Sequence, residues 1–265
     1  MKSLWTVSHG DSPLVIDVPH AGTHLPAGLH ARMTAEARTV PDTDWHVEKL
    51  YAFAPAEGAT FLCATRSRYV VDLNRDPSGA ALYPGADNTE LCPTRTFGGA
   101  PIYRDGAEPS TTEIASRRTD AFDPYHARLV QEIERVRARH GFAVVLDGHS
   151  IAGEVPRFFA GTLPDLNLGT AEGASCAPAL EWQVAQLLAD AAGFTHVVNG
   201  RFKGGWITRH YGQPHRGIHA LQLEIAQRCY MNEAPPWPFD EQRARPLQHV
   251  LRRLVAALTV WRPEA

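Results

Sequence analysis

The sequence has few cysteines and no paired cysteine motif. The four cysteines, Cys63, Cys92, Cys176 and Cys229, are widely scattered, and none belongs to a C-x-x-C pair. Four cysteines could form two disulfides, but a chain of 265 residues does not need them for stability. The cysteine content therefore favours a reducing, cytoplasmic location.

Long apolar segments are also absent. Residues 1–5 contain no apolar stretch of the kind that marks a secretory signal peptide. No run approaches the roughly 20 apolar residues that a membrane-spanning helix needs. We therefore expect a cytoplasmic protein without a membrane partner.

The chain shows no excess of basic charge. Its 26 basic and 29 acidic residues give a formal net charge of −3, and no long run of one sign occurs. Nucleic acid is therefore not an expected partner. The hydrophobic share of 44% is enough for a substantial core. We expect one domain over residues 1–265, as a monomer or a weak homo-oligomer.

Short apolar runs alternate with amphipathic stretches along the chain. The runs at residues 14–18 and 142–147 are rich in Val, Ile and Leu, which is typical of buried strands in a parallel sheet. Further strands are predicted at residues 60–64, 69–73, 195–198 and 219–225, and helices at 45–53, 110–139, 179–192 and 241–261. Pro124 should kink or break the second of these helices. The pattern predicts a single α/β domain, in which the long segment 76–109 is a functional loop.

Each of the two main apolar runs leads to a histidine. His20 follows the first run, and His149 follows the second in the sequence D-G-H-S. The carboxyl ends of parallel strands meet at one edge of a sheet, where α/β proteins bind ligands. Neutral imidazole is the commonest metal ligand, and Asp147 could orient the ring of His149. The pair predicts a metal site, although His20 alone could be a turn residue that caps a carbonyl.

A catalytic zinc site needs a third protein ligand besides an open position. Asp42 and Asp44 both lie just before the predicted helix at 45–53, and one of them should cap it. We assign Asp44 to the metal because it directly precedes the amphipathic run. His24 and His46 are competing candidates, for which a surface position is the alternative.

An acidic residue, Glu224, lies within the apolar stretch 221–225. A carboxylate in such a stretch must face water, a partner or a functional site. Burial raises the pKa of a carboxylate, which suits a general base that takes a proton from zinc-bound water. The alternative is a strand residue that faces solvent opposite Leu223.

Arginines are frequent in the predicted loops. The set comprises Arg66, Arg68, Arg75, Arg157, Arg201, Arg209 and Arg216. Arg75 directly follows the predicted strand 69–73, and Arg209 ends the glycine-rich segment 203–209. A guanidinium can bind a carboxylate through two parallel hydrogen bonds. Several arginines around a metal predict an anionic small-molecule substrate.

Six short segments together resemble one known family. They are residues 18–22 (VPHAG), 42–45 (DTDW), 68–75 (RYVVDLNR), 146–150 (LDGHS), 202–209 (FKGGWITR) and 222–226 (QLEIA), with Tyr230 and Met231 after the last. Each segment alone is a weak signal, but six in this order are specific and span about residues 14–235. The sequence resembles the N-formylglutamate amidohydrolases, also called N-formylglutamate deformylases. These enzymes release formate and L-glutamate in a bacterial route of histidine degradation.

The resemblance implies a fold and a metal site. The fold should be similar to that of zinc carboxypeptidases and aspartoacylases, with a mixed, mostly parallel sheet between helices (phosphorylase/hydrolase-like). His20, Asp44 and His149 should bind one zinc ion, whose place another divalent ion could take, and Glu224 should be the base. Asp44 stands where the carboxypeptidase relatives more often have a glutamate.

The resemblance also implies a dianionic small-molecule substrate. Asn74 and Arg75 match the place where the relatives hold the substrate carboxylate, and we expect Arg75 and Arg209 to bind the two carboxylates of N-formyl-L-glutamate. One alternative is hydrolysis of another N-acyl amino acid or of a C-terminal peptide bond, which needs a larger acyl pocket. Another is a non-catalytic ligand-binding protein, which should have lost a ligand or the base, and neither is missing here.

Overall fold

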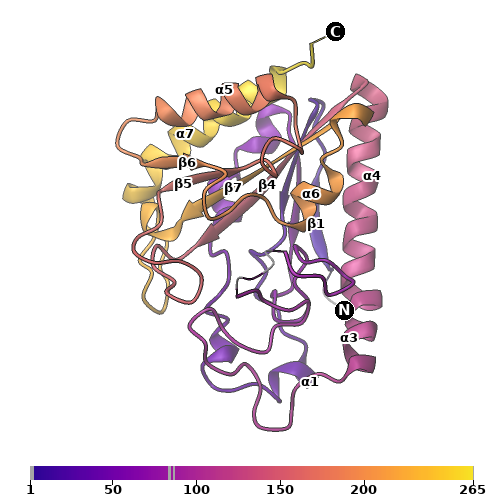
Figure 1. Ribbon diagram of the computed structural model, residues 1–265, viewed down its shortest axis with the longest axis vertical. Helices are drawn as coiled ribbons and strands as arrows, with labels where there is room; N and C mark the ends of the chain where they lie inside the picture. Colours follow the sequence, from indigo (N-terminus) through magenta and orange to yellow (C-terminus); the bar gives the residue numbers. More distant parts are fainter. Residues whose placement is uncertain (1–2, 83–84, 86, 265) are drawn as a thin grey trace.

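A seven-stranded sheet forms the centre of the molecule in the computed structural model, which describes residues 3–82, 85 and 87–264 (Figure 1). In spatial order the strands are β1 (Trp5–Ser8), β3 (Thr60–Ala64), β2 (Leu14–Val18), β4 (Ala143–Ile151), β7 (Ile218–Ala226), β5 (Leu166–Gly169) and β6 (His196–Val198). The four strands β3, β2, β4 and β7 run parallel, whereas β1 and β5 are antiparallel to their inner neighbours. The predicted mixed, mostly parallel sheet is confirmed.

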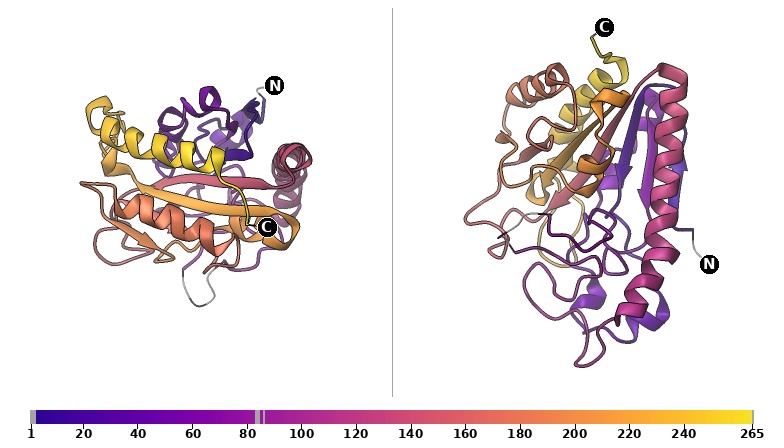
Figure 2. Two further views of the ribbon diagram at one scale, coloured as in Figure 1. Left: turned by 90° about the horizontal axis from the view of Figure 1, so that it is seen from above. Right: turned by 45° about the vertical axis from the view of Figure 1, so that its right-hand side comes forward.

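Helices cover both faces of this sheet, as the two views of Figure 2 show. One face packs against α4 (Asp123–His140) and α6 (Trp206–Tyr211), and the other against α2 (Val47–Leu50), α5 (Pro178–Ala189) and α7 (Glu241–Val260). Strand β4 explains why both faces are covered, because Val144 and Leu146 point to one core and Ala143 and Val145 to the other. No helix in the described residues is long and apolar enough to cross a membrane.

The helical stretch predicted from residue 110 is interrupted just before Pro124, the residue that was predicted to kink or break it. The side chain of Ser110 accepts a hydrogen bond from the backbone N–H of Glu113 and so caps α3 (Thr111–Arg117). A single π-helical turn, η3 (Arg118–Phe122), then precedes α4, whose first turn contains Pro124. A wider turn accommodates a residue that cannot donate a backbone hydrogen bond. The remaining short elements are α1 (Ala27–His30) and the 3-10 turns η1 (Ala37–Thr39), η2 (Ala54–Glu57), η4 (Pro214–Arg216) and η5 (Gln227–Cys229).

Two sequence-based assignments near the carboxyl edge of the sheet are wrong. Residues 69–73 form turns and irregular backbone instead of a strand, because Tyr69 and Val70 pack into a separate apolar cluster and the guanidinium of Arg117 donates to their carbonyl groups. The helix predicted at 45–53 shrinks to α2, since His46 has a left-handed backbone with φ 64°. Asp44 is therefore not a helix cap.

The bounds of β4 and α6 also differ from the sequence prediction, and each contains a predicted functional residue. Strand β4 extends to Ile151, so His149 lies inside the strand instead of after it. Arg209 lies in α6 and not in a loop. The long predicted loop at 76–109 is confirmed in its described part, and residues 83, 84 and 86 lie outside the description. Together with residues 20–46 it lies below the strand ends in Figure 1, where the predicted site should form.

Candidate metal centre

Three side chains predicted as metal ligands meet at the carboxyl edge of the parallel strands. The parallel register pairs Asp17 of β2 with Asp147 of β4, so the residues beyond them, His20 and His149, arrive at the same place. A backbone hydrogen bond from the N–H of Asp44 to the carbonyl of His20 holds the third side chain there. Within the described residues, these three form the group that could hold a metal, with donor atoms within 4.8 Å of one another.

Each histidine of this group uses one ring nitrogen to bind a buried carboxylate. Nε2 of His20 lies 2.9 Å from Oδ1 of Asp72, and Nε2 of His149 lies 2.8 Å from Oδ1 of Asp147. Asp147 therefore lies close enough to His149 to orient its ring, as predicted from the sequence. The other nitrogen, Nδ1, faces Asp44 in both cases, at 3.8 Å from His20 and 2.9 Å from His149.

This donor set fits a metal ion. When Nε2 of each ring carries the proton, Nδ1 keeps a lone pair. Nδ1 of His149 then faces the Asp44 carboxylate, whereas Nδ1 of His20 also lies 2.6 Å from Nη2 of Arg68, which has to move aside for a metal. Nδ1 of His149 and the Asp44 carboxylate, two acceptors only 2.9 Å apart, need a proton or a cation between them. In a tetrahedral zinc site with bonds of about 2.0 to 2.2 Å, neighbouring donors lie about 3.3 Å apart, between the two observed distances.

The two histidines differ in their electrostatic surroundings. Burial lowers the pKa of His20, and the nearby charge of Arg68 lowers it further. Burial would also lower the pKa of His149, but the charges and hydrogen bonds of Asp147 and Asp44 raise it well above its usual value. The lowered pKa keeps His20 neutral, as a metal ligand must be. The raised pKa of His149 means that its surroundings favour a positive charge there, either a proton on the ring or a metal ion bound to it.

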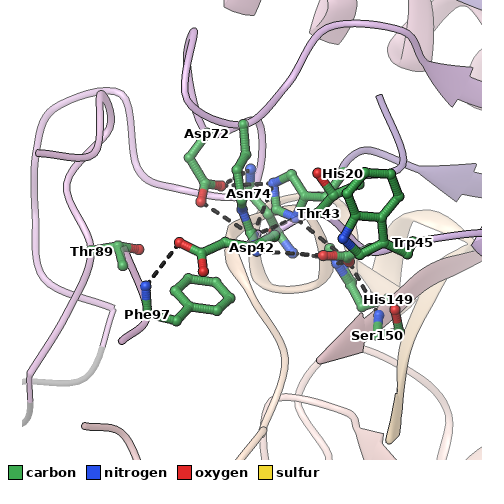
Figure 3. Close-up of polar contacts among 12 residues, drawn as sticks. His20, Asp42, Thr43, Trp45, Asp72, Asn74, Thr89, Phe97, His149 and Ser150 are labelled. Carbon is green, nitrogen blue, oxygen red and sulfur yellow. Dashed lines mark hydrogen bonds and ion pairs between the residues drawn. The ribbon is translucent and has the colours of Figure 1, made fainter. Parts of the chain in front are cut away.

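Asp42, the competing carboxylate, has other partners. Its Oδ2 accepts hydrogen bonds from the hydroxyl of Tyr69 at 2.6 Å and from the backbone N–H of Phe97 at 2.8 Å. Figure 3 shows the contact between Asp42 and Phe97 to one side of His20 and His149. Asp42 therefore ties the segment around Phe97 to the centre and does not belong to the metal-binding group.

The other two competitors, His24 and His46, also lie outside the group. The ring of His46 is bonded to the carbonyl of Trp237 at 2.9 Å. His24 is half-buried and contributes a backbone bridge to Arg66. Neither side chain belongs to the group of possible metal ligands in the described part of the chain.

A buried arginine lies directly against the centre. Nη2 of Arg68 is 2.6 Å from Nδ1 of His20 and 3.3 Å from Oδ2 of Asp72, and its Nη1 is 3.4 Å from Oδ1 of Asp44. The ring of Phe97 packs under the guanidinium at 4.8 Å. The sequence pattern included Arg68 among the loop arginines but gave it no role. A charged residue opening the apolar run 68–71 was the signal that could have marked it.

Glu224 lies beside the three-residue group. The β4–β7 register pairs it with His149, and its side chain is only 6% exposed. Burial raises its pKa to about 7, and the negative charge of Asp44 contributes. A carboxylate with this pKa is half-ionised near neutral pH and can both take up and release a proton.

Arg75 and Arg209 lie next to two hollows on either side of residues 76–82. The guanidinium of Arg75 donates to Oγ1 of Thr89 at 2.8 Å and to the carbonyl of Asn74 at 2.9 Å. Arg209 is exposed, and its Nε donates to the carbonyl of Gly204 at 2.9 Å. Arg75 is close enough to Asp72 to lower that residue's pKa. Both hollows share Asp76, Ala80 and Ala81 as walls.

A cleft of about 280 Å³ opens next to the centre. Its walls include the neighbours of two metal-site residues, Thr43 and Ser150, together with Phe97, Gln227 and Trp237. Tyr230 and Gln227 both bond to Oγ of Ser150, which holds this wall in place. The cleft thus reaches the sequence neighbours of Asp44 and His149, whereas His20, Asp44 and His149 do not themselves line it.

Comparisons with known proteins agree on one family. A family model described as N-formylglutamate amidohydrolase matches residues 12–231. The chain is 45% identical to the N-formylglutamate deformylase of Pseudomonas putida, over 100% of this chain and 98% of that protein, and 45% identical to that of Pseudomonas aeruginosa, over 98% of both. A crystal structure of an N-formylglutamate amidohydrolase from Ralstonia eutropha JMP134 is 29% identical, with a TM-score of 0.80 over 96% of this chain and 97% of that one.

Proposed function

The chain belongs to the N-formylglutamate amidohydrolase family, and from this premise we propose that it hydrolyses N-formyl-L-glutamate to formate and L-glutamate, with one zinc ion at His20, Asp44 and His149. The observation that carries the proposal is the meeting of this group with a buried carboxylate of raised pKa, Glu224. We also propose a cytoplasmic location.

The metal contributes one part of the chemistry. When bound, a zinc ion supplies a Lewis acid that polarises the formyl carbonyl and makes the attacking water more acidic. The carboxylates of Asp72 and Asp147 hold the two imidazoles in the orientation that this requires.

Glu224 moves the proton in this proposal. As a carboxylate it takes a proton from the attacking water, and as a carboxylic acid it gives that proton to the nitrogen of the departing glutamate. A pKa of about 7 suits both directions of transfer. Its position beside His149 in the sheet keeps the carboxylate next to the reacting atoms.

Arg68 stabilises the charge that develops on the formyl oxygen. Its guanidinium is 7% exposed and lies against His20, so it is a fixed cation in surroundings from which water is largely excluded. Donors of this kind stabilise the transition state more than the ground state, because the negative charge appears only as water attacks.

Arg75 and Arg209 bind the two carboxylates of the substrate. Arg75 is the nearer to the centre, since it acts electrostatically on Asp72, and we assign it to the α-carboxylate. Arg209 lines the hollow on the other side of residues 76–82, and we assign it to the side-chain carboxylate of the substrate. Both assignments rest on charge and position and are tested below.

A metal analysis combined with a formate-release assay tests the function. Protein loaded with Zn²⁺ should contain about one ion per chain and should release formate from N-formyl-L-glutamate faster than from N-formyl-L-aspartate, and N-acetyl-L-glutamate should be a poor substrate. Faster hydrolysis of the acetyl compound would favour a deacylase of another N-acyl amino acid, for which the cleft beside the centre has room. Zinc binding without hydrolysis of any member would favour a non-catalytic binding protein.

A further inference from the structure

Two buried side-chain amides, Asn74 and Gln222, are held by one short stretch of backbone at the start of α6. The N–H of Gly205 donates to Oε1 of Gln222 at 2.6 Å, and the N–H of Ile207 donates to Oδ1 of Asn74 at 2.7 Å. Both amides are nearly inaccessible to solvent. The backbone of residues 205–207 therefore fixes which end of each amide is oxygen and which is nitrogen.

With their oxygens engaged, both amides present an NH₂ group to a carboxylate of the centre. Nδ2 of Asn74 lies 3.0 Å from Oδ2 of Asp147. Nε2 of Gln222 lies 3.1 Å from Oε2 of Glu224. The backbone of residues 205–207 is thus linked through Asn74 to Asp147, the partner of the predicted ligand His149. It is linked through Gln222 to the predicted base, Glu224.

The contact with Asp147 affects His149 directly. One oxygen of Asp147 faces Nε2 of His149 at 2.8 Å, and the other accepts from Asn74. The hydrogen bond from Asn74 holds the Asp147 carboxylate beside the ring of His149, whose Nδ1 faces Oδ2 of Asp44 at 2.9 Å. Nδ2 of Asn74 also lies 2.8 Å from Nε2 of His149, so this amide contacts the ring itself as well as the carboxylate beside it.

Close packing of glycines holds the segment in this position. A Cβ atom at Gly205 would lie 2.3 Å from Nδ2 of Asn74 and 2.5 Å from its Cγ. A Cβ atom at Gly169, on β5, would lie 2.4 Å from the backbone nitrogen of Gly204. The segment can approach the amides and the sheet this closely only because these positions lack side chains.

We propose that Asn74 and Gln222 are positioning residues, through which the backbone of residues 205–207 orients His149, by way of Asp147, and Glu224. Asn74 then serves the metal site instead of binding the substrate carboxylate. The part that concerns Gln222 rests on the proposed function, because it needs Glu224 as the base. The part that concerns Asn74 does not, since it can be measured with Zn²⁺ alone.

Two near-isosteric variants separate these roles. Asn74→Asp and Gln222→Glu each keep an oxygen for the backbone N–H and replace the NH₂ donor by a carboxyl oxygen, which carries a negative charge when ionised; Asn199→Asp, below, makes the same change of charge. Competition titration of the metal-free proteins with Zn²⁺ and a chelator should show an affinity at least about 10-fold weaker for Asn74→Asp and close to the unsubstituted protein for Gln222→Glu. With N-formylglutamate, Gln222→Glu should lower kcat at least about 10-fold and leave KM within about 3-fold.

Asn199 provides a matched control. Its Oδ1 accepts from the backbone N–H of Thr170, and its Nδ2 faces the hydroxyl of Thr170 and the carboxylate of Glu181, away from the metal group. Asn199→Asp makes the same chemical change and should alter neither zinc affinity nor kcat. Equal losses in Asn199→Asp would overturn the proposal, because the effects would then reflect any lost amide donor.

Gly205→Ala tests the proposal without changing a polar group. The added methyl group must push Asn74 away, so zinc affinity and kcat should both fall at least about 10-fold while the melting temperature shows that the chain still folds. If Asn74→Asp fails to fold, Gly205→Ala alone still tests the role of Asn74 in zinc binding. Unchanged zinc affinity in both variants overturns the role of Asn74, and a rise in KM alone for Asn74→Asp would return it to substrate binding. An unchanged kcat in Gln222→Glu overturns the role of Gln222.

Discussion

The two histidines of the centre occupy the same sheet edge but are supported in different ways. His149 lies within β4, and its partner Asp147 precedes it by two residues, so both side chains project from the same face of one strand. His20 lies beyond the end of β2, and its partners Asp72 and Arg68 come from a segment about 50 residues away. One half of the centre is thus built on a strand and the other on loops.

The site therefore has a strand-borne half and a loop-borne half. The strand-borne half, His149 and Glu224, is held by the β4–β7 ladder. The loop-borne half brings the cation of Arg68 and the approach to Arg75. We expect changes in the strand-borne half to act on metal binding and chemistry, and changes in the arginine-bearing loops to act on substrate recognition.

The largest expected effect is the loss of a ligand from either half. His149→Ala or His20→Ala should abolish stoichiometric zinc binding and lower formate release from N-formylglutamate at least about 10³-fold, because the Lewis acid is lost. Zinc content by elemental analysis and initial rates check this. His24→Ala is the matched control and should keep both, since the ring of His24 lies outside the group. Full zinc binding in His149→Ala would refute the assignment of this residue.

Removal of the base should separate chemistry from metal binding. Glu224→Gln should keep zinc and lower kcat at least about 10²-fold, because the amide cannot accept the proton. In the unsubstituted protein kcat should fall about tenfold for each pH unit below about 7, since burial raises the pKa of Glu224 to about 7 and only the carboxylate form is active as base. Loss of zinc in Glu224→Gln would make Glu224 a ligand instead, and near-normal turnover would exclude it as the base.

The loop arginines should affect recognition without affecting the metal. Arg75→Ala and Arg209→Ala should each lower kcat/KM for N-formylglutamate about 10²-fold at unchanged zinc content, because one substrate carboxylate loses its partner. N-formyl-leucine lacks the side-chain carboxylate, so it should be a poor substrate and should be insensitive to loss of the arginine that binds this group.

Arg216→Ala is the control for a general loss of positive charge, since this exposed arginine bonds to Gln213. Its kcat/KM should match that of the unsubstituted protein. If both Arg75→Ala and Arg209→Ala lower kcat/KM equally for both substrates, the model of two separate carboxylate sites is wrong.

The sequence was most informative about the strand-borne half. The apolar run that leads to His149 and the carboxylate of Glu224 within an apolar strand are local patterns, and the β4–β7 register places these two residues side by side. The run before His20 has the same pattern, although His20 itself lies beyond the end of β2. Asp147 was visible for the same reason, since two residues along a strand return to the same face.

The loop-borne half was less predictable because its contacts join distant segments. The apolar run 69–73 has the pattern of a strand, yet it contains no strand, and Arg117 donates to the carbonyl groups of Tyr69 and Val70. No local pattern predicts this partner. The central position of Arg68 depends on how this segment folds. The choice of Asp44 over Asp42 likewise depends on Tyr69 and Phe97, which occupy Asp42.

The smallest expected effects separate the carboxylates behind the two imidazoles. Asp147 faces Nε2 of His149 with one oxygen and accepts from Asn74 with the other, so in Asp147→Asn an NH₂ group takes the place of one of these oxygens. Zinc affinity should then fall about 10- to 100-fold. Asp72 accepts from both Nε2 of His20 and the backbone N–H of Asn74 with the same oxygen, Oδ1, and offers the other to Arg68.

Asp72→Asn can keep its oxygen toward His20 and lose only the ion pair with Arg68. Its zinc affinity should therefore fall less than about 10-fold, and its kcat should fall more than its affinity does, because Arg68 is no longer fixed. Chelator competition with Zn²⁺ on both metal-free variants, followed by kinetics at saturating zinc, measures the two quantities separately. Equal losses of zinc affinity in Asp72→Asn and Asp147→Asn would show that the strand-borne and loop-borne histidines depend on their carboxylates in the same way, and the distinction between the two halves would fail.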